Sequence, residues 1–244
     1  MASERRRVDP GAGPADPGDG PAELSSFIGT LYQQRFSPDE VRAKQALWQT
    51  LHDAFFARYV PAGAVVVDLG AGYCDLLNAV TAARRIAVDL NPDTPRFAAS
   101  GVEVLPVSLE HVAAHLPAGS VDVMFASNVL EHLRSPEQLI AVLTSAHRVL
   151  RPGGRLIVMQ PNVRVVGGAF WDFLDHTLPL SERGMGEALT LTGFRIVECR
   201  ARFLPYSTRG RRLPSPWLVR AYLRLRPAQW LLGKQMLVVA ERPR

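Results

Sequence analysis

Cysteine, lysine and long apolar segments are all scarce in this sequence. Its 244 residues include two cysteines, Cys74 and Cys199, which are too few for a disulfide framework or a cysteine-rich metal cluster and favour a reducing, cytoplasmic location. No apolar run approaches the roughly 20 residues that a membrane-spanning helix requires, so we expect no transmembrane segment. Lys44 and Lys234 are the only lysines, and the other basic residues are arginines, which suit planar anions such as carboxylate and phosphate.

The positive charge is unevenly placed along the chain. The formal net charge is +5, and residues 195–244 contain Glu198 and Glu241 as their only acids. A nucleic-acid-binding protein would use such a basic region. A general preference for arginine on a solvated surface explains the same excess, and we favour this explanation.

The composition predicts one folded domain with appendages. A chain of 244 residues in which 47% are hydrophobic is able to bury a core of ordinary size. Residues 1–23 are rich in Gly, Pro, Ala and Asp and lack hydrophobic periodicity, so we predict a disordered tail there and a single domain at 24–244. Apolar residues at helical spacing predict a helical segment at 24–60, in which Ser37-Pro38-Asp39-Glu40 is a typical capped helix start.

The stretch AVVVDLGAGYCD at 64–75 predicts a buried strand followed by a tight turn. Its three consecutive valines do not alternate with polar residues, which is typical of a central parallel strand covered on both faces. Asp68 ends the strand, and Gly70 and Gly72 allow the backbone to approach a ligand before a helix begins. A dinucleotide fingerprint would need a third glycine where Asp75 stands, and two carboxylates disfavour a pyrophosphate but suit a ligand with an ammonium and a sulfonium group.

Three strings carry a resemblance to a known family. DLGAGYC resembles the first motif of class I S-adenosylmethionine-dependent methyltransferases, an acidic residue followed by G-x-G, although Cys74 stands where many members have another glycine. GSVDVMFASN at 119–128, continued by N-x-x-E-H-L at 128–133, resembles the fourth strand of the family and the motif after it. RVLRPGGRLIV at 148–158 resembles its helix-to-strand turn, and the resemblance extends over roughly residues 27–241.

The resemblance implies an α/β fold of the doubly wound, Rossmann-like kind. It implies a mostly parallel seven-stranded sheet with an antiparallel last strand and with helices on both faces. The residue pattern places strands near 65–68, 85–89, 102–105, 121–126, 155–160, 194–202 and 235–240. Helices are expected at 73–83, as a turn or two within 91–101, and at 109–116, 136–149, 181–191 and 216–226.

Two segments are expected to lie over the cleft. The helices at 24–60 resemble the N-terminal lid of small-molecule methyltransferases, with Tyr32, Arg35 and Phe36 as candidate lid residues. The arginine-rich insertion at 203–233 is expected to cover the substrate cleft, with lying on a membrane surface as the alternative. Its helix should turn Trp217, Ala221, Tyr222 and Leu225 to one side.

The resemblance implies S-adenosylmethionine as the cofactor and assigns residues to it. Asp89 ends the second strand about 20 residues after the glycine turn, where α/β folds place an acid that binds ribose hydroxyls. The methionine end is expected at Asp68, Gly70, Ala71 and Gly72, the adenine at Leu90, Ser108 and Leu109, and the mouth of the site at Asn128.

Two histidines are candidate catalytic residues. An oxygen acceptor must lose its proton, for which histidine is suited at neutral pH. His176 follows Asp175 in an aromatic loop after the fifth strand, and His132 lies in the E-H-L string. His111 and His115 have the i, i+4 spacing of metal ligands, but no third ligand is evident, so we predict surface positions for them and no metal site.

The sequence therefore predicts methyl transfer from S-adenosylmethionine to a small-molecule acceptor with an oxygen or nitrogen nucleophile. An RNA methyltransferase, supported by the basic C-terminal region, and a catalytically inactive cofactor-binding or regulatory protein of the same fold remain alternatives. Asp75 disfavours an NAD-dependent oxidoreductase, and the lack of an N-P-P-(Y/F) motif after the fourth strand disfavours DNA base methylation. No residue indicates the acceptor or the oligomeric state.

Overall fold

A mixed sheet runs through the computed structural model, which describes residues 21–35, 37–206 and 214–244. Most of the expected tail, the lid candidate Phe36 and part of the arginine-rich insertion lie outside this range. The strands are β1 (Val65–Leu69), β2 (Arg84–Val88), β3 (Val102–Leu105), β4 (Val121–Ser127), β5 (Leu150–Pro161), β6 (Arg195–Arg200) and β7 (Gln235–Glu241).

Helices of very different length connect and cover these strands. The described α-helices are α1 (Pro21–Arg35), α2 (Pro38–Ala54), α3 (Asp75–Ala79), α4 (Thr94–Phe97), α5 (Val112–His115), α6 (Pro136–Val149), α7 (Val163–Val166), α8 (Glu182–Leu191), α9 (Pro216–Arg224) and α10 (Arg226–Leu232). Short 3-10 turns are η1 (Phe56–Tyr59), η2 (Leu109–His111), η3 (Leu130–His132) and η4 (Gly167–Asp172). No helix among the described residues has the length and apolar character of a membrane span.

The strand order confirms the expected fold class. The order is β3-β2-β1-β4-β5-β7-β6, in which β7 pairs antiparallel with both β5 and β6 and the other pairs are parallel. The chain leaves β1 toward β2 and β3 on one side and returns to β4 on the other. Because ligands of such sheets bind outside the carboxyl ends of the strands where the order reverses, the site is expected beside β1 and β4.

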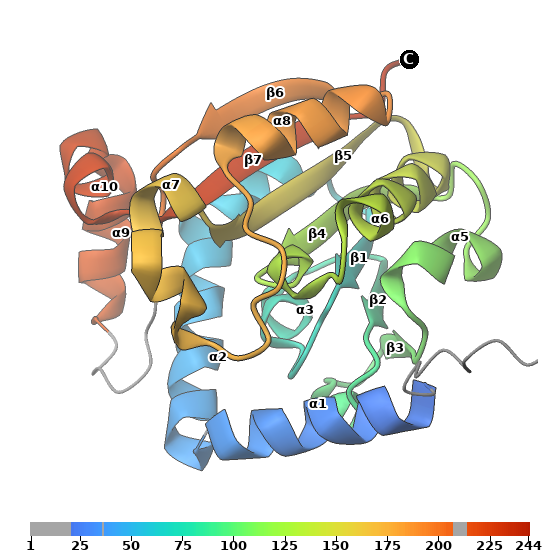
Figure 1. Cartoon of the computed structure of the whole chain (residues 1–244), viewed down its shortest axis with the longest axis horizontal. Coiled ribbons are helices and arrows are strands. Elements are labelled where there is room, and N and C mark those ends of the chain that lie inside the picture. The colour runs from blue at the N-terminus through green and yellow to red at the C-terminus, as the bar shows by residue number, and fades with distance from the viewer. Residues whose placement is uncertain (1–20, 36, 207–213) are drawn as a thin grey trace, which may run out of the picture.

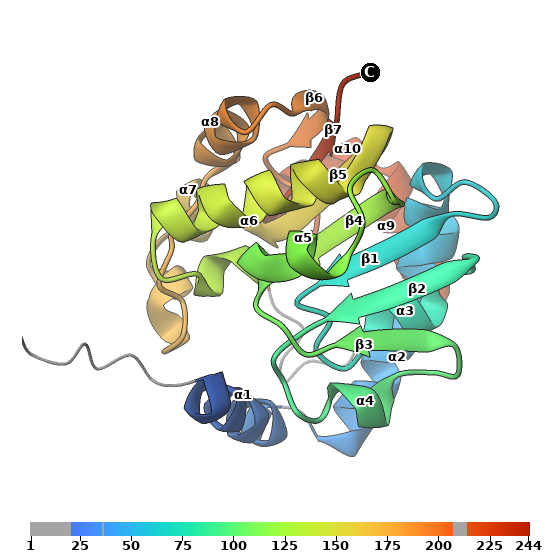
Figure 2. The same cartoon turned by 90° about the vertical axis from the view of Figure 1, so that its right-hand side faces the viewer.

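β1 is buried on both faces, as its valines predict. Val66 and Val67 are both completely buried, and they belong to two different hydrophobic cores. The first core packs α5, α6 and α8 on one face of the sheet, and the second packs α2, α3 and α9 on the other. Figure 2 shows α5 and α6 in front of the sheet and α2 and α3 behind it.

Two helices differ from the sequence expectation. α3 has five residues instead of about three turns, and Val80 after it is already extended. The backbone N–H groups of Ala83 and Arg84 then donate to the carbonyl of Ala64 at the base of β1. α9 buries Val219 and Leu223, whereas Trp217, which the sequence grouped with Ala221, Tyr222 and Leu225 on one side of this helix, is 67% exposed. The same i, i+4 spacing fits either side of this helix, and packing against the second core selects Val219 and Leu223.

α1 is joined by hydrogen bonds to the loop that follows β2. α1 begins at Pro21, inside the expected tail, and Figure 1 shows it lying crosswise at the end of α2. Ser25 Oγ donates to the carbonyl of Leu90 at 2.7 Å, and Gln33 Nε2 donates to Asp93 Oδ2 at 2.9 Å. The capping box of Ser37 and Glu40 at the start of α2 is confirmed.

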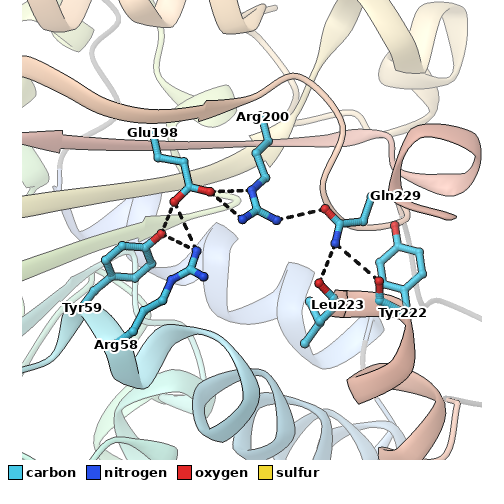
Figure 3. A network of polar contacts seen from close by, with 7 residues as sticks. All are labelled: Arg58, Tyr59, Glu198, Arg200, Tyr222, Leu223 and Gln229. Carbon is cyan, nitrogen blue, oxygen red and sulfur yellow. Dashed lines mark hydrogen bonds and ion pairs between the residues drawn. The ribbon is translucent and has the colours of Figure 1, made fainter. Parts of the chain in front are cut away.

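A polar network anchors the described part of the insertion to the sheet. In Figure 3 the guanidinium of Arg200 on β6 donates to Glu198 at 2.6 Å and to Gln229 Oε1 on α10 at 3.0 Å. Gln229 Nε2 then donates to the carbonyl of Leu223 at 2.8 Å, near the end of α9. On the other side Glu198 accepts from Tyr59 and from Arg58, at 3.2 Å for the arginine. The network fixes α9 and α10 against β6 and η1.

Candidate functional site

A large cavity lies at the carboxyl ends of β1, β2 and β4. Its volume is about 1570 Å³, and α1, α2 and α9 contribute to its wall together with residues 173–177 and 204–206. Pockets for one small ligand usually measure about 300–1,000 Å³. The cavity therefore has room for two ligands side by side.

The turn after β1 strongly favours glycine at two positions. Gly70 has φ 72°, and a Cβ there would stand 2.2 Å from Val129 Cγ2. Gly72 has φ 52°, and a Cβ there would stand 2.8 Å from the hydroxyl oxygen of Tyr32. Both side-chain-free positions bring bare backbone to the cavity wall, with Tyr32 of α1 above it.

Asp89 is tied to this turn. Its Oδ2 accepts from the backbone N–H of Gly72 at 2.6 Å, and its Oδ1 accepts from the N–H of Asn91 at 2.7 Å. Burial raises the pKa of this carboxyl, while the bonds from Asn91 and Gly72 act in the opposite direction. A carboxylate has about four acceptor positions, so two remain for a ligand in the cavity.

Asp68 and Asp75 add two further carboxyl groups at the same place. Asp68 is 4% exposed, and burial, followed by the charges of Asp89 and Asp75, raises its pKa well above the usual range. Its buried Oδ1 has no hydrogen-bond partner within the described residues, and the same holds for Asp75 Oδ1. Asp75 Oδ2 lies 3.4 Å from Lys44 Nζ of α2. Buried, under-satisfied carboxylates favour a positively charged ligand, which is the charge of a methionine ammonium and a sulfonium.

The other residues expected at the cofactor also line the cavity. Ala71, Leu90, Leu109 and Asn128 lie along it, and Asn128 has φ 51° with its N–H donating to Met159 O at 2.8 Å. Ser108 lines it as well, but its hydroxyl contacts His111 Nδ1 at 2.9 Å and does not cap the following turn. The tertiary structure thus places around one cavity all nine residues that the sequence assigned to the cofactor. Their roles toward a ligand stay predictions.

The two candidate catalytic histidines meet in the wall of the cavity. The ring centroids of His132 and His176 are 5.1 Å apart. His176 Nδ1 is 2.9 Å from the carbonyl oxygen of Phe170, and His132 Nδ1 is 2.9 Å from the carbonyl oxygen of Asp175. His111 and His115 are exposed residues at the rim of the same cavity.

Glu131 is a residue of this site that sequence reasoning missed. It is 1% exposed, its Oε2 has no hydrogen-bond partner in the described part of the chain, and burial raises its pKa to about 7. Its carbonyl oxygen accepts from the N–H groups of Thr177 and Leu178, at 2.9 and 3.0 Å, which holds the His176 loop against η3. Its position directly before His132 in the N-x-x-E-H-L string was the available signal.

The sequence of the chain is similar to those of known proteins. Residues 67–158 match the family model described as a methyltransferase domain. Over 160 residues the chain is 32% identical to an uncharacterized 37.1 kDa protein in transposon TN4556 of Streptomyces fradiae, a match covering 58% of this chain and 42% of that protein. Over 164 residues it is 30% identical to a "Probable S-adenosylmethionine-dependent methyltransferase" of Mycolicibacterium smegmatis, covering 63% of this chain and 62% of that protein. The match thus spans less than two thirds of either relative.

A solved structure shares the fold. It is a S-adenosylmethionine-dependent methyltransferase from Archaeoglobus fulgidus, which superposes with a TM-score of 0.61 over 87% of this chain and 98% of that one. The two sequences are 18% identical, so the likeness concerns the fold alone.

Proposed function

We propose that the chain is a class I S-adenosylmethionine-dependent methyltransferase, as its match to the methyltransferase-domain model supports, and that it methylates a small-molecule acceptor at an oxygen or nitrogen atom. S-adenosylmethionine supplies a methyl group bound to a positively charged sulfur. The protein must then align the acceptor with that methyl group for in-line displacement and keep water away. The exposed free thiol of Cys199 supports a reducing, cytoplasmic location.

The residues around the glycine turn hold the cofactor in this proposal. Asp89 accepts hydrogen bonds from the ribose hydroxyls with the two acceptor positions that Gly72 and Asn91 do not use. Asp68, Gly70, Ala71 and Gly72 hold the methionine end, Leu90, Ser108 and Leu109 contact the adenine, and Asn128 stands at the mouth.

The helices around the cavity exclude water. We assign 24–60 as a lid, with Tyr32 against the glycine turn, and 203–233 as an insertion whose Leu218 and Tyr222 wall the cavity. Lys44 of α2 pairs with Asp75 beside the cofactor site, so the lid and the acidic turn are electrostatically linked. Together with the rest of 24–244 these segments form a single domain in this proposal.

The acceptor occupies the part of the cavity near the two histidines. A neutral imidazole of His132 or His176 accepts the proton of an acceptor hydroxyl as the oxygen is methylated. Asp175 lies beside His132, with Oδ2 3.1 Å from its Nδ1, and would stabilise the imidazolium that forms.

One observation carries the proposal: a glycine turn beside Asp68 and Asp75, whose buried carboxyl groups each have an oxygen without a hydrogen-bond partner in the described residues, in a cavity large enough for a second ligand. The test measures binding of S-adenosylmethionine by calorimetry and then release of S-adenosylhomocysteine with a panel of small hydroxylated and amine acceptors. Binding with turnover of one acceptor supports the enzyme. Binding without turnover of any acceptor, RNA included, favours the cofactor-binding protein, and lack of binding refutes the site.

A further inference from the structure

Glu131, His132 and His176 form a compact group at the acceptor end of the cavity. One ligand atom of each lies within 4.8 Å of the ligand atoms of the other two. Two of the residues come from η3 and the third from the loop 45 positions away from Glu131 that precedes α8, and all three line the cavity. Two donor atoms bound to one tetrahedral ion at about 2.1 Å lie about 3.4 Å apart. Side-chain rotations that move the ligand atoms by roughly an ångström would therefore bring this group around an ion.

The hydrogen bonds at the histidines orient them as ligands. The carbonyl oxygens of Phe170 and Asp175 can only accept, so the Nδ1 atoms that contact them, in His176 and His132 respectively, carry the hydrogen. The lone pair of each neutral ring is then on Nε2. Metal-binding histidines in proteins characteristically donate their other ring N–H to a carbonyl or carboxylate in this way.

Glu131 supplies the charge that such a site needs. Its side chain is buried, and Oε2 lacks a hydrogen-bond partner in the described residues. Within the described ranges, the charged side chains that act on it are His132 and Asp175, and neither is a lysine or an arginine. A buried carboxylate that is ionised needs a positive partner, and a bound cation would provide one.

We propose that Glu131, His132 and His176 bind one divalent transition-metal ion, of the Zn²⁺, Fe²⁺ or Mn²⁺ class, with the remaining coordination positions open to the cavity. Three protein ligands with an open position are typical of catalytic metal sites, and two histidines with one carboxylate suit these ions. The proposal replaces our expectation from sequence that the chain binds no metal.

The ion would select the acceptor, a consequence that rests on the proposed methyltransferase function. An acceptor oxygen bound at the open position loses its proton to solvent more readily, because the cation stabilises the resulting anion. That oxygen then forms the bond to the transferred methyl carbon while the bond to sulfur breaks. With the ion bound, the two histidines serve as ligands, and this role takes the place of the proton acceptance proposed above for the metal-free site. The favoured acceptors are then hydroxyl compounds, especially those with a second oxygen that can also reach the ion.

The experiment titrates the metal-free full-length protein with Co²⁺ and follows the visible absorption bands of the bound ion, with Zn²⁺ competition to obtain its affinity. We expect one ion per chain. Glu131→Gln and His132→Gln should each weaken binding at least a hundredfold. The double variant His111→Gln/His115→Gln, which changes two exposed histidines at the rim of the same cavity, should bind as the wild type does.

Calorimetry on the same samples with S-adenosylhomocysteine, the product that S-adenosylmethionine leaves after methyl transfer, separates this proposal from the proposed function. Retained binding of that ligand by Glu131→Gln shows a folded cofactor site, and His132→Gln, whose side chain is 29% exposed, provides a second variant less prone to misfolding. The metal site is refuted if the wild type binds no Co²⁺ below millimolar concentration or if Glu131→Gln and His132→Gln bind it unchanged. Loss of S-adenosylhomocysteine binding by the wild type would instead refute the proposed function and leave the metal titration interpretable.

Discussion

Replacing Asp89 by Asn should weaken binding of S-adenosylmethionine roughly a hundredfold. Asp89 already accepts one hydrogen bond on each oxygen, from the N–H groups of Gly72 and Asn91, and it offers its two other acceptor positions to the ribose. The amide of Asn has no charge and a single acceptor oxygen. Loss of two charge-assisted bonds at about 1.5 kcal/mol each gives about 3 kcal/mol, which corresponds to roughly a hundredfold in Kd.

The same substitution should also lower stability, because one of the two backbone N–H groups loses its acceptor. The expected loss is about 1–3 kcal/mol in the free energy of unfolding, measured by urea denaturation. Glu103→Gln is the matched control, since Glu103 is exposed on β3 and pairs only with Arg84 in the described part of the chain. That variant should bind the cofactor as the wild type does.

A double-mutant cycle assigns the effect to the ribose. Wild type and Asp89→Asn are titrated by calorimetry with S-adenosylhomocysteine and with an analogue that lacks the ribose hydroxyls. If Asp89 binds those hydroxyls, the wild type loses affinity for the analogue, whereas Asp89→Asn loses little more. Affinity of the folded variant within threefold of the wild type, or fully additive losses in the cycle, would refute the assignment of Asp89.

Three further predictions concern stability. Burial raises the pKa of Glu131 from 4.5 to about 7, so the folded protein holds this proton more tightly than the unfolded chain. The resulting stabilisation is complete below pH 4.5 and is lost as the pH rises through 7, by up to about 3 kcal/mol. Urea denaturation in EDTA from pH 5 to 8 should therefore show a free energy of unfolding that falls with pH for the wild type and falls less for Glu131→Gln. Gly70→Ala should cost about 1–3 kcal/mol more than Gly63→Ala, because both positions have positive φ but only a Cβ at 70 meets a side chain; equal losses in thermal unfolding would contradict the clash. Gln229→Ala removes the acceptor of Arg200 Nη1 and the donor to the end of α9 and should cost about 2 kcal/mol; an unchanged melting temperature would show that the network of Figure 3 does not hold the insertion.

Local patterns were sufficient for the strands and for the cofactor turn. The valines of β1, the two glycines and Asp89 each depend on neighbours within a few positions, and the structure places them as those patterns indicate. The antiparallel β7 was implied by the family resemblance and is confirmed. Which face of α9 is buried did not follow from the sequence, because helical spacing leaves two faces open and only contact with the second core selects Val219 and Leu223.

The sequence by itself determined the order of the strands, the burial of β1 and the acidic glycine turn, because hydrophobic periodicity and backbone freedom act over short distances along the chain. Only the tertiary structure decided that Glu131 and His132 meet His176, that α3 stops after five residues, and that α1 and α9 wall a common cavity. These features depend on contacts between segments that are distant in sequence, and the packing that brings those segments together leaves no periodic trace in either of them.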